Sequence, residues 1–436
     1  MDRIVTFSFR DRERLGHLDL ESLEIHIRSS MHSVGSVMLE KLLNADGGDY
    51  RGRTQPCEKG HVFEFKEYRD KGVLTVLGPV TVKRAYYYDE RCKKGWCPKD
   101  IALDIEGTSL SPGVRRIIAR AGANGPFALG HEDIKEMAGI EVDPKEIERV
   151  SHQIGEEIEA FHQETVLSSG DSVSPIESVP KMYICMDGTG VPVVKTETVN
   201  RKGKVEQGEA KTREAKLGCV FTQTKVNEKG YPIRDGDSTS YGGAIETAEA
   251  FGNRIYAEAL RRGLERAQQV CVIGDGSPWI WNIAEEHFYG ATQIIDLYHA
   301  REHYWNVAHA AFGSDQAILN LWTDQRRKEL DQGEVEAVIE AIQHLSPRRK
   351  EQKEICEKEI GYFEKNKDRM RYDEFRRKGL FIGSGVVEAG CRTVIGQRLK
   401  QSGMFWTVKG ANSIIAIRCC LLSNRWEDFW EYRACA

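Results

Sequence analysis

A short apolar run that ends in a Gly-Asp-Gly turn is the feature that most constrains the fold of this chain. Residues 271–274 are Cys-Val-Ile-Gly, and Asp275 stands where the chain must leave the strand. Ser277 and Pro278 follow, and proline is favoured at the first position of a helix because its missing N–H is not needed there. Ligands of α/β proteins bind in the crevice beyond the strand ends. We therefore expect the Asp275 carboxylate to point into a crevice above a sheet.

Two further acids occupy similar positions in the sequence. Residues 181–186 form a second apolar run, which ends at Asp187 and is followed by Gly-Thr-Gly. Glu388 comes at a predicted helix start, after Gly-Ser-Gly at 383–385. Three carboxylates suffice for magnesium, which prefers oxygen ligands and holds few protein groups. Ions held in this way activate a water or a 3′-hydroxyl for phosphoryl transfer. The alternative for any one of these acids is an ordinary solvated surface position.

A fourth acid, Asp296, closes another predicted strand, and His299 follows it in the sequence Asp-Leu-Tyr-His. Both side chains can line the same crevice, where His299 would hydrogen-bond a phosphate. In the other interpretation, Asp296 only caps a helix that has His299 in its first turn. The residues alone leave both interpretations open.

Length and composition define the general class of the protein. A chain of 436 residues predicts several domains, and 40% hydrophobic with 30% charged residues is typical of soluble globular proteins. The net charge of −5 gives no global sign of nucleic-acid binding, so such a role would depend on local basic patches. The 11 scattered cysteines, and a start without a signal-peptide pattern, lead us to expect a cytoplasmic protein with no membrane span.

The first part of the chain is divided into three predicted regions. Residues 1–50 form an N-terminal helical segment, with a helical pattern from about Leu20 to Leu43, and 51–107 form a β-rich module. Two pairs of candidate zinc ligands flank a predicted hairpin in that module, as in a zinc ribbon: Cys57, His61, Cys92 and Cys97. The alternative is a β-module with incidental thiols. Residues 108–170 are helical, and the turn and capping residues between the helices predict either a helix-turn-helix that binds DNA or a helical lid.

The rest of the chain has an α/β pattern. Residues 181–311 and 380–436 form the predicted core, and the charge-rich stretch 312–379 is a helical insertion. Within 181–311 we predict separate strands at 181–186 and 190–195, and a helix over 243–267. After Glu388, basic and aromatic side chains suit a DNA backbone and a base to stack on: Arg392, Arg398, Lys400 and Trp406.

These motifs together resemble bacterial insertion-sequence transposases of the ISKra family, which is related to Mutator-like elements. The likeness covers most of the chain, including Leu-Gly-Pro-Val at 77–80 and Arg-Ala-Tyr-Tyr at 84–87. Its longest and most specific part runs from Gly383 to Trp406. The chain departs from the family after Tyr87, where Asp89 stands at the first position of the family's Cys-x-x-Cys knuckle.

The resemblance implies a ribonuclease-H-like catalytic core of the DDE type. The family's catalytic and metal-binding acids fall on Asp187, Asp275 and Glu388, and its Asp/Cys-x-x-His element falls on Asp296 and His299. It implies Mg²⁺- or Mn²⁺-dependent cleavage and strand transfer at transposon ends. Zn²⁺ is a candidate only through the cysteine and histidine spacing of the β-rich module. The implied partners are the terminal repeats and target DNA, bound by a homodimer or larger assembly in the bacterial cytosol.

Two other functional classes are consistent with parts of the sequence. A domesticated DNA-binding protein would keep the fold without catalysis, although the intact acid triad argues against it. A two-carboxylate hydrolase with a small substrate explains the paired acids, but neither the helical insertion nor the basic tail.

Overall fold

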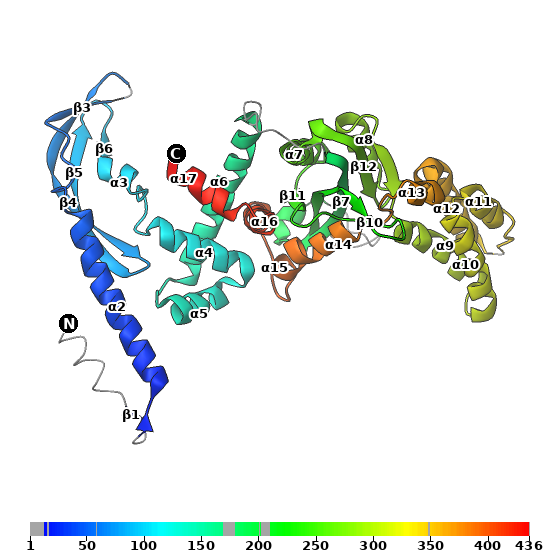
Figure 1. Cartoon of the computed structure of the whole chain (residues 1–436), viewed down its shortest axis with the longest axis horizontal. Helices are drawn as coiled ribbons and strands as arrows, with labels where there is room; N and C mark the ends of the chain where they lie inside the picture. The colour runs from blue at the N-terminus through cyan, green and yellow to red at the C-terminus, as the bar shows by residue number, and fades with distance from the viewer. Residues whose placement is uncertain are drawn as a thin grey trace. The chain divides into compact units, whose positions relative to one another are not determined.

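The computed structural model describes residues 13–14, 17–57, 59–168, 179–199, 201, 210–347 and 349–435. The chain divides into two compact units, Met1–Ser151 and His152–Ala436, and each unit is described by itself. Figure 1 labels their elements. Residues 1–12 and 15–16 of the predicted N-terminal segment lie outside the described part of the chain.

The first unit begins with a long helix and a small antiparallel sheet. Helix α2 spans Leu20–Leu43, as the sequence predicts, and the Asp19 side chain accepts from the N–H of Ser22 at its start. The sheet has the order β3-β4-β5-β6. Its strands are β3 (Thr54–Pro56), β4 (Val62–Thr75), β5 (Gly78–Asp89) and β6 (Lys94–Trp96), and a two-residue-strand pair, β1 (Glu13–Arg14) with β2 (His17–Leu18), precedes α2. Strands β4 and β5 form the predicted hairpin, with Thr75 opposite Gly78.

Four helices follow the sheet: α3 (Pro98–Ala102), α4 (Pro112–Asn124), α5 (Phe127–Ala138) and α6 (Pro144–Ser168). Ser111 caps α4 by accepting from the N–H of Val114 at 3.3 Å. Gly139 ends α5 with φ +66°, a left-handed conformation that glycine adopts without strain. The predicted succession of helices over 108–168 is thus present, and the role in DNA binding stays a prediction.

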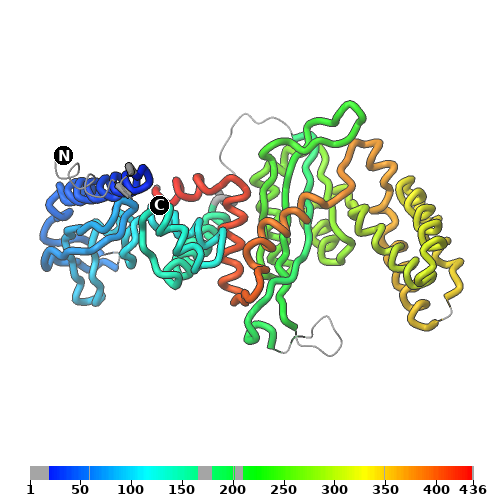
Figure 2. The backbone as a smooth tube through the Cα atoms, turned by 90° about the horizontal axis from the view of Figure 1, so that it is seen from below, coloured from blue at the N-terminus to red at the C-terminus, as the bar shows by residue number. Residues whose placement is uncertain are grey.

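The second unit is built on a mixed five-stranded sheet in the order β11-β8-β7-β12-β13. Its strands are β7 (Val179–Pro192), β8 (Thr212–Gln223), β11 (Ser240–Ala244), β12 (Ala267–Gly274) and β13 (Thr292–Ile295). Strands β7, β8 and β11 are antiparallel neighbours, while β12 is parallel to β7 and β13 is parallel to β12. Figure 2 shows the backbone of the sheet as tubes that run side by side. This mixed α/β architecture is consistent with the ribonuclease-H-like core expected from the resemblance.

Helices cover both faces of this sheet. A Cβ on Gly218 of β8 would lie 2.5 Å from Ile255 of α7 (Ala248–Arg261), so α7 packs tightly on that face. The next side chain along β8, Leu217, faces the other way and meets Gly390 at the end of α14 (Gly385–Gly390). The chain then continues through a π-helical turn (Cys391–Gly396), α15 (Gln397–Leu399), α16 (Val408–Leu422) and α17 (Trp426–Cys435).

The predicted insertion is helical in the structure. It follows α8 (Pro278–His287) and α9 (Leu297–Phe312), and consists of α10 (Gln316–Asp331), α11 (Val335–Gln343), α12 (Lys350–Asn366) and α13 (Tyr372–Arg377). Its base is tied to β13, because the Tyr372 hydroxyl donates to the carbonyl of Ile295 at 3.1 Å and Arg369 donates to Gln293 at 2.6 Å.

Two predicted elements are wrong. The separate strands expected at 181–186 and 190–195 are one continuous strand, β7, because Asp187 to Pro192 keep their pairing with β8 through the Gly-Thr-Gly sequence. The helix expected over 243–267 begins only at Ala248, because residues 240–244 pair with β8 as an edge strand instead.

A buried ion network joins α7 to the C-terminal helices. Glu258, which is 2% exposed, accepts from both terminal nitrogens of Arg425 at 2.6 Å and from Arg261 at 2.7 Å. Burial raises the pKa of Glu258, but the two arginines outweigh it and lower the pKa. His162 of α6 lines a neighbouring cavity of about 500 Å³, together with Glu258 and Arg261.

Burial, with the charge of Arg261 as a second cause, lowers the pKa of His162 to about 3. In the unfolded chain an imidazole has a pKa of about 6.5, so the unfolded state takes up a proton first as the pH falls. Because only the unfolded state gains this proton, the free energy of unfolding is unaffected by His162 above about pH 6.5. It decreases as the pH falls from there toward about pH 3.

We expect His162→Gln to reduce the acid sensitivity of the second unit. In the wild type, protonation of His162 in the unfolded state lowers the free energy of unfolding by roughly 2 kcal/mol at about pH 5 relative to neutral pH. Each pKa unit corresponds to about 1.4 kcal/mol. Urea unfolding at about pH 5 and about pH 7.5 measures this difference. The exposed His344 provides the control, because His344→Gln should unfold like wild type at both pH values. If His162→Gln loses as much unfolding free energy between about pH 7.5 and about pH 5 as wild type does, His162 is not the cause of the acid sensitivity.

Among the described residues, no helix combines the length and apolarity that crossing a membrane requires.

Candidate active site

Three aspartates lie level with one another at one edge of the five-stranded sheet. Cys185 of β7 is paired with Ile273 of β12, so Asp187 and Asp275, two residues further along each strand, reach the same height. Gly274 is paired with Ile295 of β13, which places Asp296 level with Asp275 on the next strand. Adjacent strands are about 4.8 Å apart. Asp275 and Asp296 follow the ends of β12 and β13, as predicted, whereas Asp187 lies within β7 rather than at its end. The register nevertheless makes the three acids neighbours in space.

Asp187 points toward the face of the sheet that α14 covers. It is paired with Leu217 of β8, and directly opposite residues share a face. That face carries Gly390 of α14 against Leu217, and α14 also contains Glu388. The fold thus brings the third predicted acid to the same side of the sheet as the first.

The Asp187 carboxylate is held in an environment that disfavours its charge. Burial and the nearby Asp275 raise its pKa, although the thiol of Cys391, the N–H of Gly188 and the charge of His299 act in the other direction. The N–H of Gly188 donates to Asp187 Oδ1 at 2.7 Å. The raised pKa of Asp187 means that the surrounding groups do not fully compensate the negative charge of its ionised carboxylate.

The Asp275 carboxylate is fixed by the turn that follows it. Ser277 donates to Oδ1 through its N–H at 2.8 Å and to Oδ2 through its hydroxyl at 3.0 Å. Tyr362 of α12 donates to the Asp275 carbonyl at 3.1 Å, and its ring stacks on His303. Gly276 has φ +101°, and a Cβ there would lie 2.7 Å from the Tyr362 ring. Only glycine fits this turn.

Asp296 is fully buried and connects two elements of the site. Its Oδ1 accepts from the N–H groups of Tyr298 at 2.7 Å and His299 at 2.9 Å, which caps α9. Its Oδ2 accepts from the N–H of Ser384, whose hydroxyl donates to Glu388 Oε1 at 2.9 Å. Asp296 is therefore the predicted helix cap and also a link to Glu388 through Ser384. The role of His299 at a phosphate stays a prediction.

His299 lies beside this carboxylate. Its Nδ1 is 3.3 Å from Asp296 Oδ1, and this contact raises the pKa of His299 to about 9. One ligand atom from each of Asp296, His299 and Glu388 lies within 4.8 Å of the others. The structure thus groups Glu388 with the Asp-x-x-His element, while Asp187 and Asp275 stand on the neighbouring strands.

The four residues predicted to contact DNA separate into two pairs. Arg392 and Lys400 are exposed, and Lys400 donates to the hydroxyl of Thr189 on β7. Arg398 and Trp406 are 1% and 7% exposed, and the guanidinium lies 4.8 Å from the indole ring centre. The sequence predicts that Trp406 is exposed, but Trp406 is part of the core. A β-bridge holds its backbone beside Val193.

The candidate zinc ligands also separate. Cys57, Asp89 and Cys92 have ligand atoms within 4.8 Å of one another, and His61 lies against Cys92. Cys97, at the start of α3, belongs to no such group among the described residues.

Comparison with known proteins adds a weak structural similarity. No protein-family model matches the chain, and no curated protein matches its sequence. Among solved structures, the chain is similar to the Drosophila P element transposase strand transfer complex, with 11% sequence identity and a TM-score of 0.24. The match covers 77% of this chain and 84% of that chain. A similarity at this level does not assign a family.

Sequence reasoning missed two residues that shape the site. Ser384 stands inside the Gly-Ser-Gly motif, but only its contacts with Asp296 and Glu388 reveal its role. Tyr362 gave no signal, because it belongs to the charge-rich helical pattern and meets Asp275 across 87 residues of sequence.

Proposed function

We propose that this chain is a DDE transposase of a bacterial insertion sequence, which binds element ends and catalyses metal-dependent DNA strand cleavage and strand transfer. The observation that carries the proposal is the alignment of Asp187, Asp275 and Asp296 at one sheet edge, with Glu388 held nearby through Ser384. The motif resemblance adds the DDE assignment to this geometry.

The donor set fits Mg²⁺ or Mn²⁺. The acids offer carboxylate oxygens, the ligands that these hard cations prefer. The raised pKa of Asp187, caused by burial and by Asp275, is the imbalance that a cation at this edge would relieve. Asp187, Asp275 and Glu388 would hold the metal. When bound, it supplies Lewis-acid stabilisation of the charge that develops on the phosphate oxygens.

His299 would hold a proton beside the scissile phosphate. With a pKa of about 9, its ring is protonated at neutral pH, and Nδ1 faces Asp296. The other ring nitrogen then donates a charge-assisted hydrogen bond to a phosphate oxygen. Asp296 acts as a positioning residue in this scheme, because it fixes both His299 and the segment before Glu388.

The DNA-binding surface would be local, since the chain has a net charge of −5. Arg392 and Lys400 are the exposed basic side chains next to the site, and they suit the backbone of bound DNA. We assign recognition of the terminal repeats to the β-rich module and helices α4 to α6. Cleavage at two element ends requires a homodimer or larger assembly on the DNA.

Incubation of the purified protein with DNA that carries the flanking element ends tests this function. We expect site-specific nicks with Mg²⁺ or Mn²⁺ and none after chelation. Glu388→Gln should abolish the nicks, because it removes one carboxylate charge without changing the side-chain shape. Glu354→Gln, an exposed glutamate on α12, should cleave like wild type.

The other outcomes separate the alternatives. Specific binding without nicks from any of these proteins would favour a catalytically inactive, domesticated DNA-binding protein. Equal nicking by Glu388→Gln and wild type would mean that the third acid is a different residue.

A further inference from the structure

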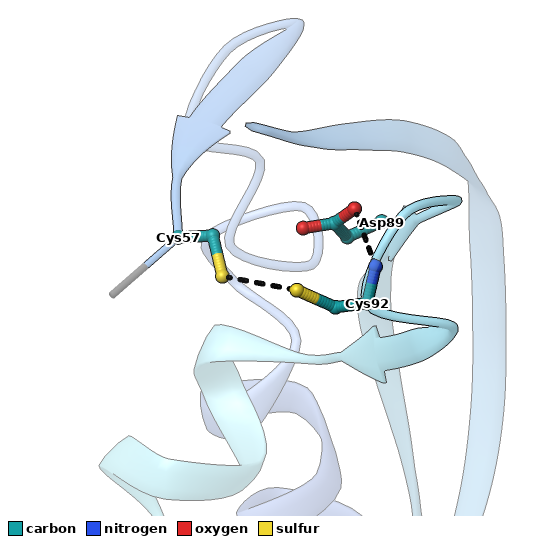
Figure 3. A group of neighbouring side chains, drawn as sticks. All are labelled: Cys57, Asp89 and Cys92. Carbon is teal, nitrogen blue, oxygen red and sulfur yellow. Dashed lines mark hydrogen bonds between the residues drawn. The ribbon is translucent and has the colours of Figure 1, made fainter. Parts of the chain in front are cut away.

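Two turns at one end of the β-rich module face each other and bring four ligand-type side chains together. The first turn joins β3 to β4, and the Cys57 N–H donates to the His61 carbonyl at 2.9 Å across it. The second joins β5 to β6, where Asp89 is paired with Lys94. Figure 3 shows Cys57 on one side, with Asp89 and Cys92 opposite.

The spacing of the sulfur atoms fits a shared metal ion. Cys57 Sγ and Cys92 Sγ are 3.8 Å apart, and both cysteines are free thiols. Two thiolates at about 2.3 Å from one tetrahedral zinc lie about 3.8 Å from each other. His61 Nδ1 is 3.0 Å from Cys92 Sγ and 3.7 Å from Asp89 Oδ2, so it borders the group that Cys57, Asp89 and Cys92 form.

Asp89 is a buried carboxylate with one oxygen aimed into this group. The residue is 1% exposed, and Oδ1 accepts from the N–H groups of Arg91 at 2.8 Å and Cys92 at 3.1 Å. Its Oδ2 is buried and has no hydrogen-bond partner among the described residues. Its ionisable neighbour is the His61 ring, with Nδ1 at 3.7 Å. A buried carboxylate oxygen that accepts no hydrogen bond is costly unless it is paired or coordinates a cation.

We propose that Cys57, His61, Asp89 and Cys92 form a structural zinc site in which Asp89, rather than Cys97, is the fourth ligand. The mixed set of two sulfurs, one imidazole nitrogen and one carboxylate oxygen uses only ligand types that zinc accepts. This inference does not depend on the proposed transposase activity.

The location explains why a metal is useful there. The aliphatic core of the module, formed around Val73, Val80 and Ile105, lies along the opposite end of the β4–β5 hairpin. Near the ligand group the sheet carries an aromatic layer, with Trp96 against Phe63 and Tyr87. Two short strands, β3 and β6, end at the ligand group. Zinc would join both turns where the sheet is too small to bury a core.

Cobalt titration of the full-length protein after chelation tests the site. Co²⁺ replaces Zn²⁺ in tetrahedral sites, and its thiolate charge-transfer absorption appears only where cysteine is a ligand, so the catalytic acids do not contribute to the signal. We expect saturation at one Co²⁺ per chain and complete displacement by Zn²⁺. Asp89→Ala should weaken binding by roughly tenfold or more.

Two variants keep the test decisive if Asp89→Ala fails to fold. Asp89→Cys retains four ligands and should raise the charge-transfer intensity about 1.5-fold, from two thiolates to three. Cys97→Ala should leave the titration unchanged. Absence of the band in wild type would overturn the proposal. A band that Cys97→Ala abolishes, and that neither Asp89 variant changes, would overturn the assignment of the fourth ligand.

Discussion

Asp187→Asn is expected to reduce DNA cleavage by about 1,000-fold or more while leaving DNA binding intact. The amide has the shape of the carboxylate but none of its charge, so the variant loses the several kcal/mol of transition-state stabilisation that a bound metal supplies. Single-turnover cleavage of end-containing DNA measures the chemical step, and a gel-shift assay in Ca²⁺ measures binding separately.

The same substitution should not destabilise the metal-free protein. A carboxyl whose pKa is raised by burial and by Asp275 is unfavourable at neutral pH, where it must ionise. Asp187→Asn should therefore unfold at the same temperature as wild type or higher when no metal is present. Saturating Mg²⁺ should stabilise wild type by about 2.7 kcal/mol at 100 times its Kd, and the variant by much less.

Asp368→Asn is the matched control for both measurements. This aspartate is 87% exposed and lies on the helical insertion, so its loss of charge should change neither cleavage nor the response to Mg²⁺. Cleavage by Asp187→Asn at the wild-type rate would exclude this aspartate as a metal ligand.

Asp296→Ala is expected to destabilise the second unit by roughly 3–5 kcal/mol, because it leaves buried donors without an acceptor. Three N–H groups converge on this carboxylate, from Tyr298, His299 and Ser384. Burial alone would raise the pKa of Asp296, but hydrogen bonds from His299 and Ser384 outweigh it and lower the pKa. Its stabilising contribution is therefore complete above about pH 4 and is lost as the pH falls through the lowered pKa.

Urea unfolding at neutral pH measures the effect of Asp296→Ala. Asp315→Ala is the matched control, because Asp315 also caps a helix but is exposed, and its side chain accepts from the N–H of Ile318 at 3.3 Å. Its loss should cost about 1 kcal/mol. If the two substitutions cost the same, Asp296 is no more than a helix cap. His299 offers a second readout, since its pKa should fall toward about 6.5 once its partner is removed.

The sequence was informative where local signals decide the structure. The apolar runs before Asp187 and Asp275 predicted strands, and the strands place both acids at one edge of the sheet. Helix α2 begins and ends where its pattern predicts. In these cases, side-chain periodicity and the turn residues contain the necessary information.

Long-range pairing was beyond the reach of those signals. Residues 240–244 form a strand only because β8 lies beside them, and Gly-Thr-Gly at 188–190 continues β7 for the same reason. The contact between Ser384 and Asp296 spans 88 residues, so the position of Glu388 relative to Asp296 and His299 could not be derived from spacing. Trp406 has the composition of a stacking residue, but its burial depends on the fold around it.

The attachment of the helical insertion divides it into a constrained base and a freer tip. Tyr362 and Tyr372 fasten the base to the backbone at Asp275 and Ile295, directly beneath the acids. Changes in these two contacts would shift the carboxylates. No hydrogen bond joins these acids or tyrosines to the described residues between α11 and α12, 344–347 and 349. During divergence, the tip can therefore gain or lose length and acquire new surface contacts, while the base must change together with the sheet edge that it supports.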